Sequence, residues 1–287
     1  MGRVAGITVL ADNSVQGRGL LAEHGLAFWI EVEDQRLLFD TGQGAVLSHN
    51  AQQLGVPLEQ AGAVVLSHGH YDHAGGLADL LQAAPQARIC AHPAAFEPKY
   101  GRGDDGTTHD IGMPSACESA VRKRTGAVTR TERPSEVLRG LFATGEIPRR
   151  TEYENTGGPF FTDSECQQVD ALVDDQALFF DSLRGTVVLL GCAHAGVINT
   201  LRYVRELTDG RPVHAVLGGM HLVTASRRQM DQTIEDLRRL DIKHLGPAHC
   251  TGLAATAELW NALPGRFFSC AVGTHVDFEL ARTGRHC

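Results

Sequence analysis

Apolar residues in the first third of the chain fall into short runs separated by helical patterns. Five runs have the length of buried strands: 6–11, 26–33, 35–40, 63–68 and 87–92. Helical periodicity appears at about 44–54 and again directly after His73. This alternation predicts an α/β protein in which functional loops follow strand ends.

The second half repeats the pattern. Strands are expected at 176–182, 185–191, 213–219 and 243–249, and helices at 197–208 and 226–239. The first two of these strands should form a hairpin around Leu183 and Arg184. Residues 99–126 and 150–172 are polar and weakly periodic, so we expect lids or substrate-facing insertions within a single domain, 1–287.

Composition narrows the class of protein. The chain has 287 residues, 43% hydrophobic and 21% charged, which excludes a disordered or coiled-coil protein. Its net charge of -8 argues against nucleic acid or an anionic membrane surface as a partner. No apolar run approaches the roughly 20 residues of a membrane span, and the first residues lack a signal-peptide pattern, which predicts a cytoplasmic protein.

The seven cysteines are odd in number and lack C-x-x-C spacing. They therefore indicate free thiols in a reducing compartment.

Histidine carries the strongest chemical signal. The chain has 14 histidines, and three of them fall in the segment Ser-His-Gly-His-Tyr-Asp-His, residues 67–73, where an apolar run ends. On extended backbone His68 and His70 point to the same side and can bind one metal, while Asp72 and His73 can reach a neighbouring one. The glycines at 69, 75 and 76 allow the tight loop that this arrangement needs.

This H-x-H-x-D-H pattern, with Phe39-Asp40-Thr41-Gly42 upstream, resembles the metallo-β-lactamase superfamily. More narrowly, the chain is similar to the branch of dihydropterin ribofuranosylaminobenzene phosphate synthases, also called dihydropteroate-synthase-like proteins. Besides the histidine loop, this similarity rests on short stretches at 21–26, 144–149, 191–194, 218–222 and 249–252. The resemblance implies a four-layer αββα sandwich of two mixed sheets, with a metal site at one edge.

Three more histidines, His194, His221 and His249, follow strand-like runs. By resemblance His249 fills the last ligand position, at a second metal with Asp72 and His73. We assign His194 to the first metal with His68 and His70, which leaves a position open for water.

The sequence departs from the superfamily around the predicted hairpin. The superfamily usually has a ligand histidine before the hairpin and a bridging aspartate after it, whereas this chain has Val173-Asp174-Asp175 and then Cys192 and His194. The bridging ligand is therefore missing or replaced. Cys192 is a candidate thiolate ligand or a small buried cysteine beneath the site.

Several residues have two or more interpretations. Asp40 is a candidate for orienting a ligand imidazole or for forming a turn. His221 is a candidate extra ligand, proton donor or phosphate contact, and it joins Asp72 as an expected catalytic residue. Arg149 and Arg150 are candidates for clamping an anionic substrate, or are solvated surface charges.

These observations predict a hydrolase, or related transferase, that uses one or two zinc ions, with iron or manganese as alternatives. Metal-activated water would attack a phosphoester or carbonyl ester of a small anionic substrate, by resemblance a pterin or ribose phosphate. The alternatives are an iron redox metalloprotein with the same ligands and a non-catalytic sensor that retains the metal cage. Nucleotide-binding and serine-hydrolase motifs are absent from the sequence.

Overall fold

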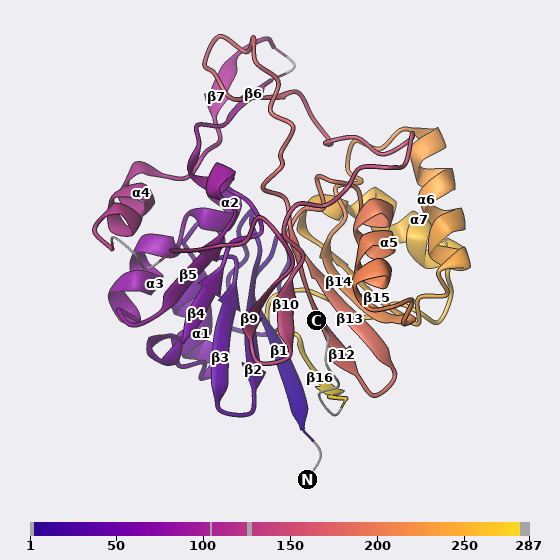
Figure 1. The fold of residues 1–287 in the computed structure, drawn as a ribbon, viewed down its shortest axis with the longest axis horizontal. Coiled ribbons are helices and arrows are strands. Elements are labelled where there is room, and N and C mark those ends of the chain that lie inside the picture. The colour runs from indigo at the N-terminus through magenta and orange to yellow at the C-terminus, as the bar shows by residue number, and fades with distance from the viewer. Residues whose placement is uncertain (1–2, 104, 125–127, 282–287) are drawn as a thin grey trace.

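Two large β-sheets pack face to face in the computed structural model, which describes residues 3–103, 105–124 and 128–281 (Figure 1). The first sheet has the strand order β16-β1-β2-β3-β4-β5-β8. Its strands in chain order are Val4–Ala11, Ala27–Val32, Gln35–Phe39, Ala63–Val65, Arg88–Ala91, Val128–Arg130 and His275–Glu279. β3, β4, β5 and β8 run parallel, so their carboxyl ends meet at one edge.

The second sheet has the order β15-β14-β13-β12-β10-β9. Its strands are Ser135–Leu138, Leu141–Ala143, Ala177–Ser182, Gly185–Leu190, Val213–Gly219 and His244–Ala248. β12 and β13 form the predicted antiparallel hairpin, and β13, β14 and β15 are parallel.

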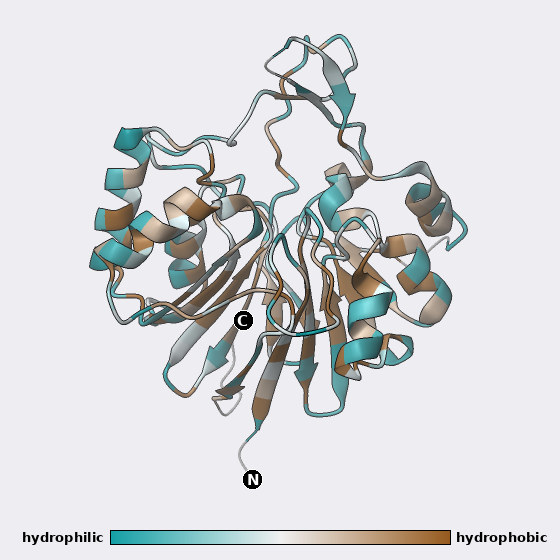
Figure 2. Ribbon diagram, turned by 180° about the vertical axis from the view of Figure 1, so that it is seen from behind, coloured by the Kyte–Doolittle hydropathy of each residue, from teal (hydrophilic) through white to brown (hydrophobic). Residues whose placement is uncertain are grey.

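Helices cover the outer face of each sheet, as Figure 2 shows from behind, with hydrophilic residues on the outer helices. α1 to α4 (Leu47–Leu54, Tyr71–Ala74, Leu77–Ala83 and Ser115–Arg122) lie against the first sheet, and α5 to α7 (Val197–Leu207, Arg227–Arg239 and Leu253–Ala262) lie against the second. Single-turn helices η1, η2 and η3 occupy Leu58–Gln60, Pro93–Phe96 and His249–Thr251. The predicted αββα sandwich of two mixed sheets is confirmed.

The continuous apolar runs arise because strands are buried on both faces. In β2, Phe28 and Ile30 belong to the core between the sheets, while Trp29 between them belongs to the core under the helices. All three side chains are fully buried. One strand thus links two cores, which explains why its sequence does not alternate with polar residues.

A third, small sheet projects above the edge where strand ends meet (Figure 1). It joins β6 (Tyr100–Arg102), β7 (Thr108–Asp110) and β11 (Phe160–Phe161), in the order β11-β6-β7. These strands, and α4, lie in the segments 99–126 and 150–172, which were expected to be lids or substrate-facing insertions and for which no strand or helix was predicted. The sequence did not reveal them because the strands have two or three residues each and none of these residues is buried, so they lack an apolar period. We call the three strands the cap sheet.

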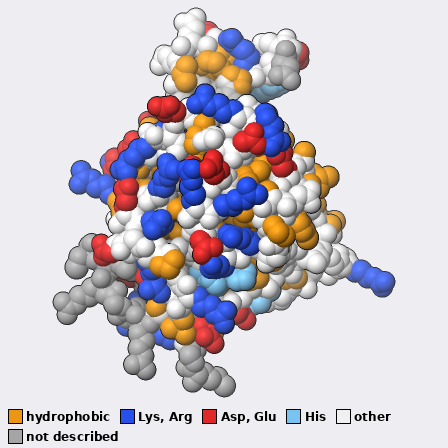
Figure 3. Space-filling model, turned by 90° about the vertical axis from the view of Figure 1, so that its right-hand side faces the viewer, with side chains coloured by type: hydrophobic (Ala, Val, Ile, Leu, Met, Phe, Trp, Pro, Cys, Tyr) orange, Lys and Arg blue, Asp and Glu red, His pale blue; other side chains and the backbone are white. Residues whose placement is uncertain are grey.

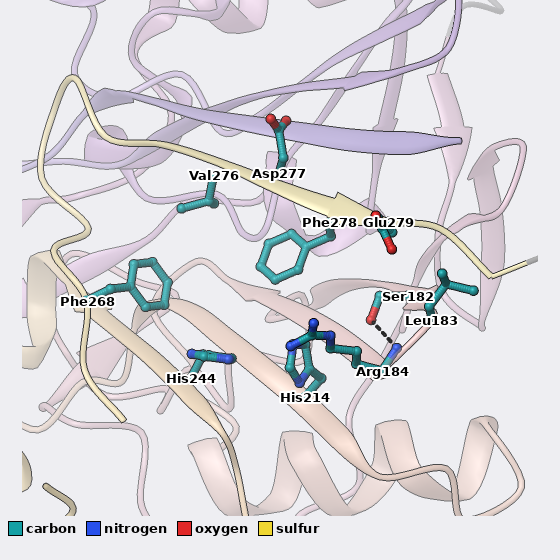
Figure 4. A pocket seen from close by; sticks show the side chains of 10 residues that line it. All are labelled: Ser182, Leu183, Arg184, His214, His244, Phe268, Val276, Asp277, Phe278 and Glu279. Carbon is teal, nitrogen blue, oxygen red and sulfur yellow. Dashed lines mark hydrogen bonds between the residues drawn. The ribbon is translucent and has the colours of Figure 1, made fainter. Parts of the chain in front are cut away.

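Further elements were not predicted, among them the short strands β8, β9 and β10, and also α7 and β16. α7 carries few charges and no clear polar face, and β16 is an edge strand that pairs antiparallel with β1. β16 borders a cavity of about 410 Å³ at the end of the sandwich opposite the cap sheet, lined by His214, His244 and Phe278 among others (Figure 4).

The surface over α5 to α7 mixes acidic and basic side chains (Figure 3). Ion pairs such as Arg202–Asp236 and Arg239–Glu235 account for part of this mixture. Among the described helices, none has the length and apolar composition to cross a membrane. Six of the seven cysteines are buried and free, and Cys287 lies outside the described residues.

Candidate metal centre

The histidine loop begins where β4 ends, and its tight course depends on glycine. A Cβ at Gly69 would lie 2.1 Å from the carbonyl oxygen of Ala95, so no side chain fits there. The backbone N–H of Gly69 donates to Asp174 Oδ2 at 2.8 Å. Close packing and this hydrogen bond fix the backbone between His68 and His70.

The first ligand group contains His68, His70 and His194, as expected from the sequence. His68 Nε2 lies 3.0 Å from His70 Nδ1, and the ring centroid of His194 lies 4.8 and 5.0 Å from those of His68 and His70. His194 Nδ1 donates to the Thr156 carbonyl at 2.7 Å, which leaves Nε2 as the acceptor nitrogen. That Nε2 is buried and has no hydrogen-bond partner among the described residues.

Burial keeps these imidazoles neutral. It is the largest cause that lowers the pKa of His70, to about 3, and it also places the pKa values of His68 and His194 well below the usual range. Neutral imidazole is the form that binds a metal. An unpartnered buried nitrogen is costly, so His194 Nε2 fits a metal ion well.

The second group contains Asp72, His73 and His249. His249 Nε2 lies 3.2 Å from Asp72 Oδ2 and 3.3 Å from His73 Nε2. His249 Nδ1 contacts Asn13 Oδ1 at 2.8 Å, so the Asn13 side chain orients the ring. The structure therefore brings together all six residues expected as metal ligands, in two adjacent groups.

Asp40 orients His73. Its carboxylate accepts hydrogen bonds from His73 Nδ1 at 2.7 Å and from the Ser67 backbone and hydroxyl at 2.6 and 2.7 Å. Burial lowers the pKa of His73, but the charges of Asp40 and Asp72 outweigh it and raise that pKa to about 9 in the absence of metal. Of the two interpretations of Asp40, the structure favours the one in which its carboxylate holds a ligand imidazole.

Cys192 lies between the two groups. Its Sγ is 3.1 Å from His73 Nε2, and its ligand atom lies within 4.8 Å of those of His68 and His194 and also of those of His73 and His249. Burial raises the pKa of the Cys192 thiol well above its usual value, so a bound metal would have to displace its proton. The thiol thus stands between the ligand groups, where the resemblance led us to look for an aspartate.

Backbone strain is concentrated at the strand ends that border the site. Asp40, Ala193, His221 and His249 all have positive φ, between 45° and 59°. This conformation is unfavourable for residues other than glycine, by about 1–3 kcal/mol each, and it clusters at functional sites. Here it turns the chain sharply at the ends of β3, β13, β14 and β15.

His221 lies beside the first group, with its ring centroid 4.4 Å from that of His194. Phe160 of the cap sheet covers this region, with its ring 5.2 Å from both His70 and His194 and 6.3 Å from His221. The cap sheet therefore places the Phe160 ring beside the candidate metal ligands.

The two arginines expected to bind substrate are engaged elsewhere. Arg149 donates to the carbonyls of His194 at 2.7 Å and Ala171 at 2.6 Å, and Arg150 pairs with Glu206 at the surface. These contacts support the backbone around His194 and the surface of α5. Their role in binding an anion stays a prediction.

Several residues around the site have contacts that were not predicted from the sequence. His24 Nε2 lies 3.2 Å from Asp72 Oδ2, and its side chain is 52% exposed. Lys99 is buried between Asp170 and Asp174, at 2.9 and 3.0 Å, and links the cap segment to the histidine loop through Asp174. No local pattern marks these residues, because their partners lie far away in the sequence.

Residues 21–211 match the profile of the metallo-beta-lactamase superfamily, which covers more than half of the chain. The chain belongs to this superfamily. The crystal structure of Tm1679, described as a metal-dependent hydrolase of the β-lactamase superfamily, superimposes with a TM-score of 0.79 at 30% identity, covering 95% of this chain and 98% of that one. The expectation of a metallo-β-lactamase-fold metallohydrolase is confirmed at the level of the family.

Two proteins of Methanocaldococcus jannaschii are similar along most of their length. The uncharacterized protein MJ0448 is 30% identical, covering 88% of this chain and 93% of its own. The 7,8-dihydropterin-6-methyl-4-(β-D-ribofuranosyl)-aminobenzene-5′-phosphate synthase is 27% identical, covering 86% of this chain and 87% of its own. The narrower resemblance noted in the sequence is thereby confirmed.

Proposed function

We propose that this protein hydrolyses, or transfers a group from, a small phosphoester or carbonyl ester with the help of one or two zinc ions. The observation that carries the proposal is the pair of ligand groups on either side of Cys192 at one edge of the sandwich. Imidazole, carboxylate and thiolate are the ligands that zinc prefers. When bound, such an ion lowers the pKa of water and polarises the electrophile.

The residues of this chain supply the cage and its orientation. His68, His70 and His194 would hold the first ion, and Asp72, His73 and His249 the second. Asp40, Thr156 and Asn13 fix which ring nitrogen of His73, His194 and His249 faces the ligand position. The Cys192 thiolate, between the two groups, would take the place of the usual bridging carboxylate.

Proton transfer is assigned to His221 and Asp72. His221 adjoins the first ligand group, and we propose that it donates a proton to the leaving group. Asp72 contacts the exposed His24, through which a proton would reach solvent.

The substrate is proposed to be an anion with a flat or apolar portion. Phe160 offers a ring to such a group, and the similar synthase from M. jannaschii is named for a phosphorylated ribosyl pterin compound. Arg149 contributes by holding the His194 carbonyl, and direct contact of Arg149 or Arg150 with the substrate is part of the proposal.

Metal quantification on protein purified without added metal, followed by a panel of chromogenic esters, tests this proposal. The panel contains a phosphomonoester, a phosphodiester, a lactone and a thioester, and we expect turnover of one class by the zinc-loaded protein. The proposal fails if protein with full metal content turns over none of them. Iron in the purified protein would instead support the redox alternative.

A further inference from the structure

Two thiols and an imidazole lie together on the side of the cage that faces β14 and β15. Cys192 follows β13, His221 follows β14, and Cys250 lies in η3 after β15. Their ligand atoms lie within 4.8 Å of one another. Cys192 and Cys250 are buried, and His221 is half-buried. Ligands at the corners of a zinc tetrahedron with bonds of about 2.0–2.3 Å are separated by less than this distance.

The backbone leaves room for both sulfur atoms. A Cβ at Gly219 would lie 2.6 Å from Cys250 Sγ and 3.3 Å from Cys192 Cα, so any larger residue would push the thiols apart. Cys250 Sγ also lies 3.6 Å from the Cys192 carbonyl oxygen. Glycine at the end of β14 thus permits the approach of two chain segments that are far apart in the sequence.

His221 has a buried nitrogen that the rest of the described chain does not use. Its Nδ1 has no hydrogen-bond partner there. The opposite edge of the ring lies against Gly157, where a Cβ would lie 1.8 Å from His221 Cδ2. A buried ring nitrogen without a partner is costly, and the positive φ of His221 adds strain to the same residue.

We propose that Cys192, His221 and Cys250 form a third metal position that selects a thiophilic ion such as Zn²⁺, Cd²⁺ or Cu⁺. Two sulfur ligands and one nitrogen favour soft or borderline ions over Mn²⁺ or Mg²⁺. A divalent ion entering this position displaces one proton from each thiol, so two protons leave for each ion bound.

This position competes with the proposed hydrolytic site. It uses Cys192, which otherwise lies between the two ligand groups, and His221, to which we assign proton transfer. A thiophilic ion bound there therefore lowers hydrolysis, whereas the position itself exists whether or not the protein is a hydrolase.

Cadmium titration of the metal-free protein tests the position through sulfur-to-metal charge-transfer absorbance in the ultraviolet. We expect the saturating absorbance to fall to about half in either Cys192→Ala or Cys250→Ala and to vanish in the double variant, because each thiolate contributes one metal–sulfur bond. Cys90→Ala, which removes a thiol from the core between the sheets, is the matched control and should leave the absorbance unchanged. Mn²⁺ should produce no such absorbance.

An unchanged absorbance in Cys250→Ala overturns the proposal, as does the absence of any thiolate absorbance in the wild type. If a variant fails to fold, X-ray absorption spectroscopy of the wild type loaded with one equivalent of cadmium counts sulfur neighbours directly. Two sulfurs around one ion support the position, and one or none contradicts it. The ester panel is measured separately, on protein loaded with no more than two equivalents of zinc, so failure of the hydrolase proposal would leave this result intact.

Discussion

Histidines gather at both ends of the sandwich, and their surroundings differ. At the cap end, ring nitrogens of His73, His194 and His249 are fixed by a carboxylate, a carbonyl and an amide. At the opposite end, His214 and His244 lie with ring centroids 4.8 Å apart, and their ring nitrogens have no hydrogen bond to any other described residue (Figure 4).

The two ends differ in how their imidazoles are oriented, although the rings lie at similar distances from one another. At the cap end the second nitrogen of each ring is directed at other ligands, because the first nitrogen is held. At the other end the His214 ring packs against Phe278, the His244 side chain is exposed, and both line an open cavity. The orienting residues, more than the histidines, distinguish the two ends.

The largest difference between the two ends is expected when one histidine is removed from each. His70→Ala removes a ligand and should abolish metal binding at the first site together with activity. The loss of metal affinity should exceed the roughly 10- to 100-fold that follows the loss of an orienting partner. His244→Ala should change neither. Metal content by mass spectrometry and ester hydrolysis measure both, with circular dichroism to verify the fold. Full activity in His70→Ala would refute the ligand assignment.

A second test removes the buried cation near the cap. Lys99→Met leaves the carboxylates of Asp170 and Asp174 buried without a partner and should lower the free energy of unfolding by about 3–5 kcal/mol. The exposed pair of Lys243 and Asp241, near His244, is the control, and Lys243→Met should cost less than about 1 kcal/mol. Urea denaturation compares the variants, and equal losses would contradict the role of burial.

Carboxylate–imidazole pairs exist at both ends and permit a matched test. Asp40→Asn, beside His73, should weaken metal binding by about 10- to 100-fold, because the amide no longer orients the ring as a carboxylate does. Asp277→Asn, beside the half-exposed His275, should leave metal affinity unchanged. Competition with a chromogenic chelator measures both affinities, and equal affinities in the two variants would remove Asp40 from the site.

The smallest predicted effect concerns Asp175, which is buried next to the site. Burial raises its pKa to about 7, while the Ala195 N–H that donates to it acts in the opposite direction. The folded state therefore holds a proton that the unfolded chain loses above pH 3.8, and stability falls as pH rises from there to about 7. Asp175→Asn should stabilise the metal-free protein at pH 8 by on the order of 1 kcal/mol more than at pH 4.

Thermal unfolding at the two pH values measures this difference. The exposed Asp34→Asn is the control, for which we expect the same small change at both. An effect of Asp175→Asn that does not depend on pH would show that its carboxyl group titrates normally.

Much of the cage could be predicted because its ligands follow strands that the apolar pattern reveals. His68, His70, Asp72 and His73 lie in one loop, and parallel strands bring His194 and His249 to the same edge. The cap sheet and β16 were missed because short or edge strands depend on pairing rather than on their own apolar period.

The sequence by itself determined the alternation of strands and helices and the histidine loop, since both follow from local patterns of apolar runs and histidine spacing. The αββα sandwich and the place of His249 were expected from the resemblance to the superfamily. Only the tertiary structure placed Cys192 between the two ligand groups, Cys250 beside it, and Asp174 between Lys99 and the histidine loop. These contacts join residues tens to hundreds of positions apart. Their geometry is set by how the two sheets pack, and no local sequence pattern encodes it.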